Sequence, residues 1–286
     1  MKLPKERRQV EIISLICSVG DQHSVADLCD LFYVEIATIH RDLQELRSLG
    51  LSIHSLNGRV RVTRPLTEKD LQMLLSRYAA SVGDAIAFPK STSLLVKKQK
   101  IRSLQIFSAL VRAIEQHKVL EIHYYKMFDD TFVTRIVEPY QLFSTSRDWL
   151  LIARSDGIFK HFLLQNIKEI KETKELFRRS RDFDPAEFHR LSFEYWTGEE
   201  TYPVQLKFSK KVAHTIINGI WGEDQEISRG PDGSVILKIR VNSLQQLGIW
   251  ILSWGGDVKV LKPASLRQEL VRKAKGFAST NLRRSN

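Results

Sequence analysis

Cysteine is scarce in this sequence, since the 286 residues contain only two, Cys17 and Cys29. They do not form a C-x-x-C pair, and two thiols alone cannot complete a four-ligand metal site. The spacing also offers no disulfide framework of the kind found in small secreted domains. We therefore expect both thiols to lie in helices as small buried apolar side chains, in the reducing environment of a cytoplasmic protein.

Long apolar segments and catalytic fingerprints are also missing. No run approaches the length of a membrane span, and the charged start, Met-Lys-Leu-Pro-Lys-Glu-Arg-Arg, lacks the apolar core of a signal peptide. There is no P-loop, nucleophile elbow, H-E-x-x-H motif or dinucleotide-binding fingerprint. We therefore expect no membrane partner, no metal, no cofactor and no enzymatic activity.

Positive charge is abundant but unevenly spread. The net charge of +11 favours a polyanionic partner. Residues 1–64 carry a net charge of +1, residues 65–118 carry +5, residues 119–261 carry −1, and residues 262–286 carry +6. The surplus therefore lies in a connecting segment and a C-terminal tail. A prediction of DNA binding has to rest on how side chains are arranged, because bulk charge does not identify the module that binds.

Apolar spacing predicts three short helices at the start of the chain. The first covers residues 5–19, Ser24 is suited to cap the second, and the third covers residues 35–48 and ends before Gly50. The predicted buried stripe of the third helix consists of Ile36, Ile39, Leu43 and Leu46.

The third helix and the segment after it favour DNA binding. Two short helices joined by a tight turn present the second helix outward, where its side chains can enter a major groove. Apolar residues then alternate around Asn57-Gly58, a strong hairpin signal. Arg59, Arg61 and Arg64 share one face of this hairpin, which is typical of a wing that touches phosphate or the minor groove. The alternative is a small helical domain with a solvated charged face.

The candidate DNA contacts are the polar side chains on the outward face of the third helix and on the hairpin: Thr38, His40, Arg41, Gln44, Arg47, Arg59 and Arg61. We assign phosphate contacts to Thr38 and Arg41, and wing contacts to the two hairpin arginines. His40 is explained equally well as a merely exposed polar residue. Asp42 is expected to hold a local hydrogen bond, because DNA would repel its charge.

The stretch V-E-I-A-T-I-H-R-D-L-Q-E-L, from Val34 to Leu46, resembles the V-S-x-R-T-V-x-R-D-L-x-x-L recognition helix of DeoR-like and WYL-family transcription regulators. Glu35 stands where that family favours a capping Ser, and Ala37 stands where it favours an Arg that contacts phosphate or base. The matching residues are Thr38, Arg41, Asp42, Leu43 and Leu46. The resemblance implies a winged helix-turn-helix.

Connecting helices are predicted next, from a capping-box-like T-E-K-D at Thr67 to a helix over residues 104–116. They contain a basic cluster of Lys97, Lys98, Lys100 and Arg102. A solvated face is the favoured explanation of this cluster, and contact with a phosphate backbone is the other.

From Lys118 the apolar period changes to two, and further strands are predicted at residues 132–140, 149–154, 157–164 and 167–171. Five short antiparallel strands suggest a small barrel. The region resembles the WYL domain. Arg135-Ile-Val-Glu-Pro139-Tyr140-Gln-Leu142 is similar to R-x-x-x-P-Y-x-L, and Asp148-Trp149-Leu150-Leu151 to G-x-W-Y-L, with Leu150 in place of the Tyr. Lys160 to Ile167 is similar to R-x-F-x-L-x-R-I.

The resemblance implies an Sm-like barrel whose pocket binds a regulatory ligand, often a nucleotide or a nucleic-acid fragment. Arginine and tyrosine suit that role, because they supply phosphate forks and stacking faces. The candidate ligand contacts are Tyr124, Arg135, Tyr140, Trp149, Lys160 and His161. For Trp149 the favoured alternative is a place in the barrel core, whereas pocket lining is favoured for Tyr124, Arg135 and His161.

The C-terminal third is predicted to follow the order β-α-β-β-α-β with a final helix over residues 264–277, which is a ferredoxin-like order. The stretch from Ile249 to Gly255, followed by V-x-V-L-x-P at Val258–Pro263, resembles the WCX extension of WYL proteins. Trp250 and Trp254 share a helix face, as core residues or as a dimer contact. The basic tail, which either reaches DNA or is disordered, contains Arg272, Lys273, Lys275, Arg283 and Arg284.

The sequence thus predicts an α+β multidomain protein. The expected parts are a winged helix-turn-helix at residues 1–64, a helical linker at 65–117, an Sm-like WYL barrel at 118–195 and a ferredoxin-like WCX domain at 201–280. We predict a cytoplasmic transcription regulator that binds double-stranded DNA, is a homodimer by family resemblance, and senses a ligand that modulates operator binding. The alternative is a protein that binds single-stranded nucleic acid or RNA through the barrel.

Overall fold

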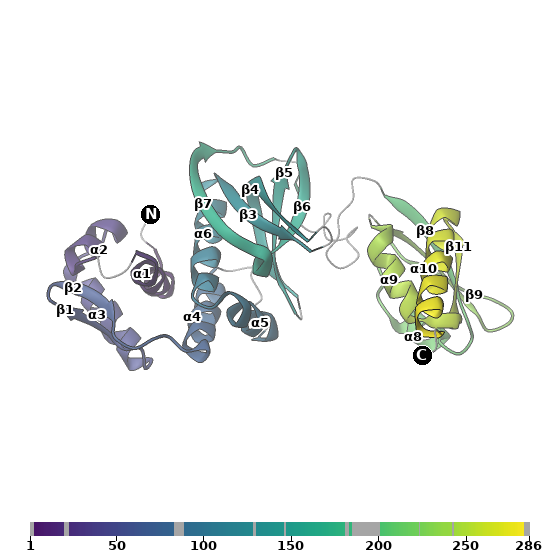
Figure 1. Ribbon diagram of the computed structural model, residues 1–286, viewed down its shortest axis with the longest axis horizontal. Helices are drawn as coiled ribbons and strands as arrows, with labels where there is room; N and C mark the ends of the chain where they lie inside the picture. The colour runs from purple at the N-terminus through teal and green to yellow at the C-terminus, as the bar shows by residue number, and fades with distance from the viewer. Residues whose placement is uncertain are drawn as a thin grey trace. The chain divides into compact units, whose positions relative to one another are not determined.

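A computed structural model describes residues 3–19, 23–82, 89–127, 130–145, 147–180, 183–184, 201–222, 224–241 and 243–282. The chain is an α+β protein that divides into two compact units, Met1–Arg179 and Ser180–Asn286, each with its own hydrophobic core. Figure 1 labels the elements of both units. The finer domain boundaries stay predictions. Within the described ranges, no helix is both long enough and apolar enough to cross a lipid bilayer.

The first unit opens with three helices and a hairpin where the sequence predicts them. They are α1 (Lys5–Val19), α2 (Val25–Phe32), α3 (Ile36–Ser48), β1 (Ile53–Leu56) and β2 (Arg59–Val62). A capping box starts α2, because the Ser24 hydroxyl accepts a hydrogen bond from the Asp27 backbone N–H and the Asp27 carboxylate accepts one from the Ser24 N–H. Asn57 (φ 50°) and Gly58 (φ 74°) have the left-handed backbone that a tight Asn-Gly hairpin requires.

One member of the predicted stripe on α3 is not buried. Ile39, Leu43 and Leu46 lie in the core, as predicted, but Ile36 is 58% exposed. Ile36 is the first residue of α3, one turn before the buried part of the stripe begins. The helical period identifies the side of α3 that faces the core, whereas neighbouring elements decide how much of that side is covered.

Three further helices join this module to a sheet: α4 (Glu68–Ala80), α5 (Pro89–Gln99) and α6 (Arg102–Gln116). Thr67 starts α4 in a second capping box with Asp70, which confirms the predicted helix start. Helix α6 is buried along much of its length, because it packs against α1, α4 and α5 and also against three strands of the sheet. It therefore lies in a core that the N-terminal helices and the sheet share.

The five predicted strands of the first unit form one antiparallel sheet with the order β6-β5-β4-β3-β7. They are β3 (Lys118–Lys126), β4 (Thr131–Ser144), β5 (Trp149–Ser155), β6 (Ile158–Leu163) and β7 (Ile167–Leu176). β4 and β7 are longer than predicted. Residues Asp156 (φ 55°) and Gly157 (φ 84°) form the tight turn between β5 and β6.

The second unit is a four-stranded antiparallel sheet with the order β11-β8-β10-β9, packed against helices. Its elements are β8 (Tyr202–Phe208), α8 (Ala213–Asn218), β9 (Glu226–Arg229), β10 (Val235–Val241), α9 (Leu244–Ser253), β11 (Val258–Lys262) and α10 (Ala264–Leu282). This confirms the predicted order of strands and helices, although α10 extends beyond residue 277. Trp250 and Trp254 pack edge-on against Phe208, so both contribute to the core as predicted.

A buried ion pair fixes α3 against α1. Arg8 donates to the Asp42 carboxylate from Nε at 2.5 Å and from Nη2 at 3.1 Å, and the two side chains are only 7% and 2% exposed. The Gln9 amide adds a hydrogen bond to the same carboxylate at 3.4 Å. Asp42 thus holds hydrogen bonds within the protein, but the prediction that they are local is wrong, because its partners lie more than thirty residues away.

We predict that Arg8→Met lowers the free energy of unfolding of the first unit by about 3 kcal/mol, because Asp42 would remain buried without its cation. Urea unfolding followed by circular dichroism measures this change. Lys171→Met, which breaks the exposed pair with Glu121, is the control and should change it by less than about 0.5 kcal/mol. Equal effects of the two substitutions would contradict a structural role for the buried pair.

Candidate nucleic-acid interface

The outward face of α3 is open to solvent. His40, Arg41, Gln44 and Arg47 are exposed and Thr38 is half-buried, on the side of the helix opposite the buried stripe. Among the described residues, Arg41 has no ion-pair partner. The helix therefore projects these predicted contacts away from the core, and the Arg41 guanidinium is available for an external anion.

Arg47 also has an internal role. Its Nη1 donates to the backbone oxygen of Ile53 at 3.2 Å, so it ties the last turn of α3 to the first strand of the hairpin. A guanidinium has five N–H donors, and one bond to a backbone oxygen leaves others for a second partner. Arg47 therefore fixes the hairpin relative to α3 while its side chain stays exposed.

The predicted basic face of the hairpin divides into two parts. Arg59 is exposed and Arg61 is half-buried, two residues apart on β2. Arg64 lies beyond the strand and pairs with Asp70 of α4 at 3.1 Å, and it also donates to the backbone oxygen of Gly50. Arg64 therefore holds the segment after the hairpin against α4, and Arg59 is the most exposed of the three arginines.

Apolar side chains at the start of α3 also lie at this surface, although no local pattern predicts their exposure. Tyr33, with a left-handed backbone after α2, is 87% exposed and lies near the exposed Ile36. Tyr33 also contributes to a shallow cavity of about 590 Å³, whose other lining residues are Cys29, Asp30, Val34, Glu35 and Thr38. The helical period assigned Ile36 to the core, so only the observed exposure identifies this group.

The predicted ligand contacts of the WYL-like region do not form one cluster. Trp149 is fully buried, with its ring edge-on to Phe107 and its Nε1–H donating to the Thr92 hydroxyl at 3.2 Å. Tyr140 is also buried and packs against Phe159 and Phe177, with Arg179 over its ring. Trp149 is thus a core residue, the alternative favoured from the sequence, and neither ring is open to a ligand in this conformation.

Arg135 and Lys160 do come together, because both pair with Asp156 in the β5–β6 turn, at 3.3 Å and 3.1 Å. Their cations hold the pKa of Asp156 below its usual value, with Lys160 as the larger cause. Tyr124 is half-buried, and its hydroxyl accepts a hydrogen bond from the Leu163 backbone N–H at 3.2 Å. His161 of β6 packs against Phe143 of β4, across the intervening strand β5.

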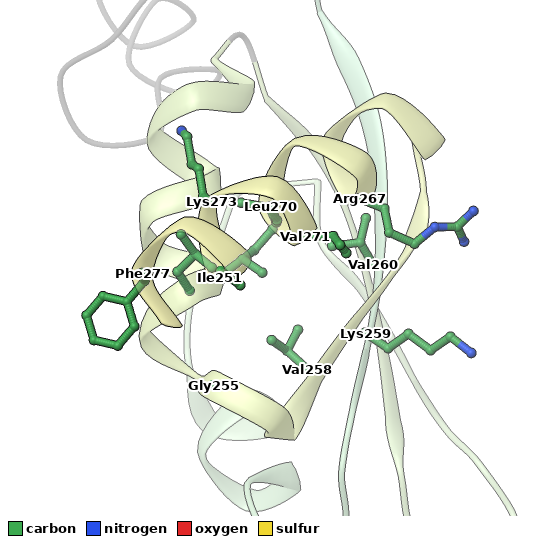
Figure 2. Close-up of a pocket in the computed structure, with 12 residues that line it drawn as sticks. Ile251, Gly255, Val258, Lys259, Val260, Arg267, Leu270, Val271, Lys273 and Phe277 are labelled. Atoms are coloured by element: carbon green, nitrogen blue, oxygen red, sulfur yellow. The ribbon is translucent and has the colours of Figure 1, made fainter. Parts of the chain in front are cut away.

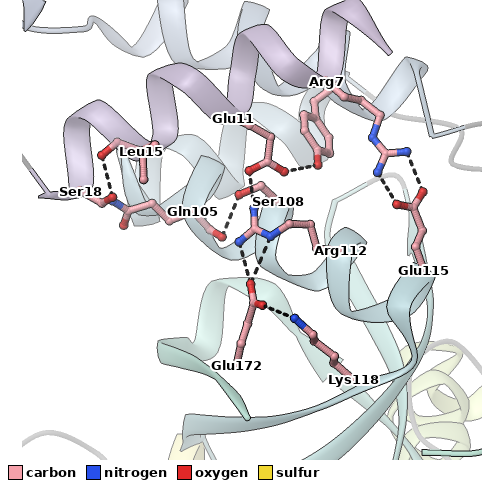
Figure 3. A network of polar contacts seen from close by, with 11 residues as sticks. Arg7, Glu11, Leu15, Ser18, Gln105, Ser108, Arg112, Glu115, Lys118 and Glu172 are labelled. Atoms are coloured by element: carbon pink, nitrogen blue, oxygen red, sulfur yellow. Dashed lines mark hydrogen bonds and ion pairs between the residues drawn. The ribbon is translucent and has the colours of Figure 1, made fainter. Parts of the chain in front are cut away.

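A network of charged side chains links α1 to α6 and β7 (Figure 3). Both terminal guanidinium nitrogens of Arg7, Nη1 and Nη2, donate to Glu115 at 2.6 Å, and the Tyr78 hydroxyl donates to Glu11 at 2.7 Å. Arg112 of α6 lies at the centre of the network, since it pairs with Glu11 and also donates to Glu172 at 3.1 and 2.8 Å. One guanidinium therefore joins the N-terminal module to the sheet.

Burial and charge act in opposite directions on the two carboxylates that contact Arg112. Burial raises the pKa of Glu11 above its usual value, and the nearby Arg112 offsets this only in part. Burial acts the same way on Glu172, but hydrogen bonds and charge from Arg112 outweigh it and lower the pKa of Glu172. Of the two carboxylates, Glu11 is therefore the one that depends more on Arg112 to stay ionised.

Two domain families match the chain. Residues 105–172 match the WYL domain, and residues 200–278 match the WCX domain. Together the two matches cover just over half of the chain. The comparison with curated proteins found no match.

Similar solved structures include proteasome accessory factor B/C (PafBC) of Arthrobacter aurescens, at 19% identity and a TM-score of 0.34, over 97% of this chain and 49% of that one. Another is a CRISPR Cas-related protein, at 10% identity and a TM-score of 0.49, over 99% of this chain and 86% of that one. The chain thus spans about half the length of the PafBC structure. Because both TM-scores are below 0.5, the family assignment rests on the two domain matches.

We predict that Arg112→Met lowers the stability of the first unit by about 2 kcal/mol at pH 7, less than for a fully enclosed pair because Arg112 is 30% exposed. Without this cation the already raised pKa of Glu11 rises further, so the folded state takes up a proton as the pH falls. The deficit relative to the parent protein should therefore shrink between pH 7 and pH 5. Urea unfolding at several pH values measures it.

Lys118→Met is the matched control, because Lys118 contacts only the Glu172 side of the network, at 3.4 Å. Its effect on stability should be small and should not vary between pH 7 and pH 5. A deficit for Arg112→Met that stays constant over the same interval would show that the protonation of Glu11 is not involved.

Proposed function

This chain belongs to the WYL-domain proteins and carries a WCX domain behind the WYL domain, and from this premise we propose that it is a transcription regulator that binds duplex DNA and responds to a ligand. The observation that carries the proposal is the open face of α3, with Arg41 exposed beside Gln44 and Arg47. A rigid helix that presents such side chains to solvent is suited to a major groove.

In this proposal residues 1–64 form a winged helix-turn-helix, with α3 as the recognition helix and the β1–β2 hairpin as the wing. The bond from Arg47 to Ile53 supports it, because it would keep helix and wing at a fixed separation on the duplex. Arg59 and Arg61 would contact phosphate or the minor groove. The exposed Ile36 would contact thymine methyl groups, the apolar feature of the major groove.

We further propose that the five-stranded sheet is an Sm-like sensor barrel and that the second unit is ferredoxin-like. The strand order β11-β8-β10-β9, with helices after the first and third strands of the unit, supports the latter. In the barrel, Arg135 and Lys160 would receive an anionic ligand such as a nucleotide or a nucleic-acid fragment, in competition with Asp156. Tyr124 would supply a ring face, whereas His161 follows Lys160 directly on β6 and its side chain therefore points to the opposite face of the sheet.

The proposal includes a structural connection between the five-stranded sheet, which would bind the ligand, and helix α3, which would bind DNA. Helix α1 is linked to β7 through Arg112 of α6, which pairs with both Glu11 and Glu172, and it contacts α3 through Arg8 and Asp42. A ligand that shifts the sheet would therefore act on α1, and α1 would change the orientation of the recognition helix.

A homodimer is the proposed assembly, because a two-fold pair would place two copies of α3 in major grooves about one helical turn apart. The sedimenting mass of the full chain in solution tests this part separately. A mass equal to one chain at micromolar concentration would contradict it.

We predict that Arg41→Ala weakens binding of the full chain to a duplex that the chain itself selects from random sequences, by about tenfold. The slope of log K against log salt concentration should become shallower by about 0.9, because one phosphate contact is lost. Fluorescence anisotropy titrations at several salt concentrations measure both. Arg147→Ala removes an exposed arginine between β4 and β5, and this control should leave affinity and slope unchanged.

The same titrations separate the regulator from the alternative, a single-strand or RNA-binding protein that acts through the barrel. If the Arg41→Ala variant binds every nucleic acid as the parent does while Arg135→Gln abolishes binding, the nucleic-acid-binding site lies in the barrel. If no duplex is bound at any salt concentration, the proposed function is wrong.

We predict that Asp156→Asn strengthens binding of a short single-stranded oligothymidylate to the WYL domain about fivefold, because a carboxylate no longer competes with the phosphates for Arg135 and Lys160. Anisotropy of the labelled oligonucleotide measures the change in the full chain. Glu175→Gln, which removes an exposed carboxylate of β7, is the control. Equal affinities of the two variants would contradict a role for this pair of cations.

A further inference from the structure

The second unit contains a cavity that belongs to neither of the candidate sites of the first unit. It is an open cavity lined by residues of α9, β11 and α10, with a volume of about 670 Å³ (Figure 2). That volume falls within the range of small-molecule sites, roughly 300–1,000 Å³. The cavity is formed by the WCX-matched residues alone, so it does not depend on how the two units are arranged.

The lining of this cavity is mainly apolar and partly exposed. Ile251, Val260 and Leu270 lie at the edge of the core, whereas Val271 and Phe277 are open to solvent, with Phe277 73% exposed. Clustered apolar side chains of this size at a concave surface are uncommon on a soluble protein unless they bind something. The concavity favours an occupant with an apolar body.

The charged residues that line the cavity are all basic. Its charged lining residues are Lys259, Arg267 and Lys273, and no lining residue is acidic. Lys273 pairs with Glu269 at 2.8 Å, but the side chains of Lys259 and Arg267 have no acidic partner among the described residues. In Figure 2 these two side chains extend to the same side of the cavity, and Phe277 lies at the opposite end.

The basic lining favours one of two kinds of occupant, a second copy of helix α10 or an anionic molecule. A second copy of α10 on this face would bring Arg267, Lys273 and their neighbours Arg272 and Lys275 against the same cations, with one acid per helix, Glu269, to offset them. Like charges in close contact oppose such a pairing. A molecule with a negative group at the end near Arg267 and an apolar body toward Phe277 would complement both features.

We propose that the cavity between α9, β11 and α10 binds a small amphipathic organic anion, with its acidic group beside Arg267 and Lys259 and its acyl or aromatic body against Val258, Val260 and Val271. This is a second ligand site, separate from the WYL barrel. It is independent of the proposed DNA binding, and it remains testable if that proposal fails.

The probe is 8-anilinonaphthalene-1-sulfonate, an aromatic anion that fluoresces when it enters an apolar site. We expect saturable binding to the full chain and displacement by decanoate, with much weaker displacement by uncharged decanol. Arg267→Gln should weaken binding of the probe about tenfold, since it removes a charge-assisted contact. Arg272→Gln is the matched control, because it removes an exposed cation of the same helix that does not line the cavity, and it should have no effect.

A second pair of variants tests the location of the site. Ala274→Trp fills the cavity from an exposed position and should abolish probe binding, and Val271→Glu should do the same by repulsion if the first variant folds poorly. Circular dichroism verifies folding of each variant. The proposal is overturned if Arg267→Gln and Arg272→Gln behave alike, or if a folded Ala274→Trp or Val271→Glu binds the probe as the parent does. It is also overturned if Phe277→Ser lowers the sedimenting mass, because the face would then join two copies of the chain.

Discussion

The arrangement of the first unit depends on the ionic contacts of a single helix, α1. On one side Arg8 of α1 binds the buried Asp42 of α3, and on the other Glu11 is held by Arg112. Charges removed from water are costly unless they are paired, so these contacts strongly restrict where α1 can lie. The position of the outward face of α3 follows from that restriction, and so does the way the module meets the sheet.

The nearly neutral N-terminal module still presents basic side chains on particular faces. Residues 1–64 carry a net charge of only +1, and the charges turned inward are balanced, because Arg7 and Arg8 are buried as well as Glu11 and Asp42. The side chains that remain outside include Arg41 and Arg59. Local potential at a surface depends on which charges face the solvent, and a sum over the sequence counts the inward ones equally.

The two candidate ligand sites differ in whether their cations are already paired with an acidic side chain. In the WYL domain, Asp156 already occupies the cations Arg135 and Lys160, so a ligand there has to displace an internal partner. In the WCX domain, Arg267 and Lys259 stand beside an apolar cavity with no acid in its lining. The first arrangement favours a strongly anionic ligand that can compete, and the second favours a weaker anion whose apolar body supplies most of the affinity.

Local rules were enough to predict the order of helices and strands from the sequence, because caps, turn residues and apolar periods act over a few residues. The Asn57-Gly58 hairpin was identified in this way. Only the tertiary structure decided that Ile36 is exposed, that Tyr140 is buried, and that Arg64 is engaged by Asp70 while Arg41 stays open. Exposure and ion pairing depend on segments far apart in the chain, and no local pattern records which of them meet.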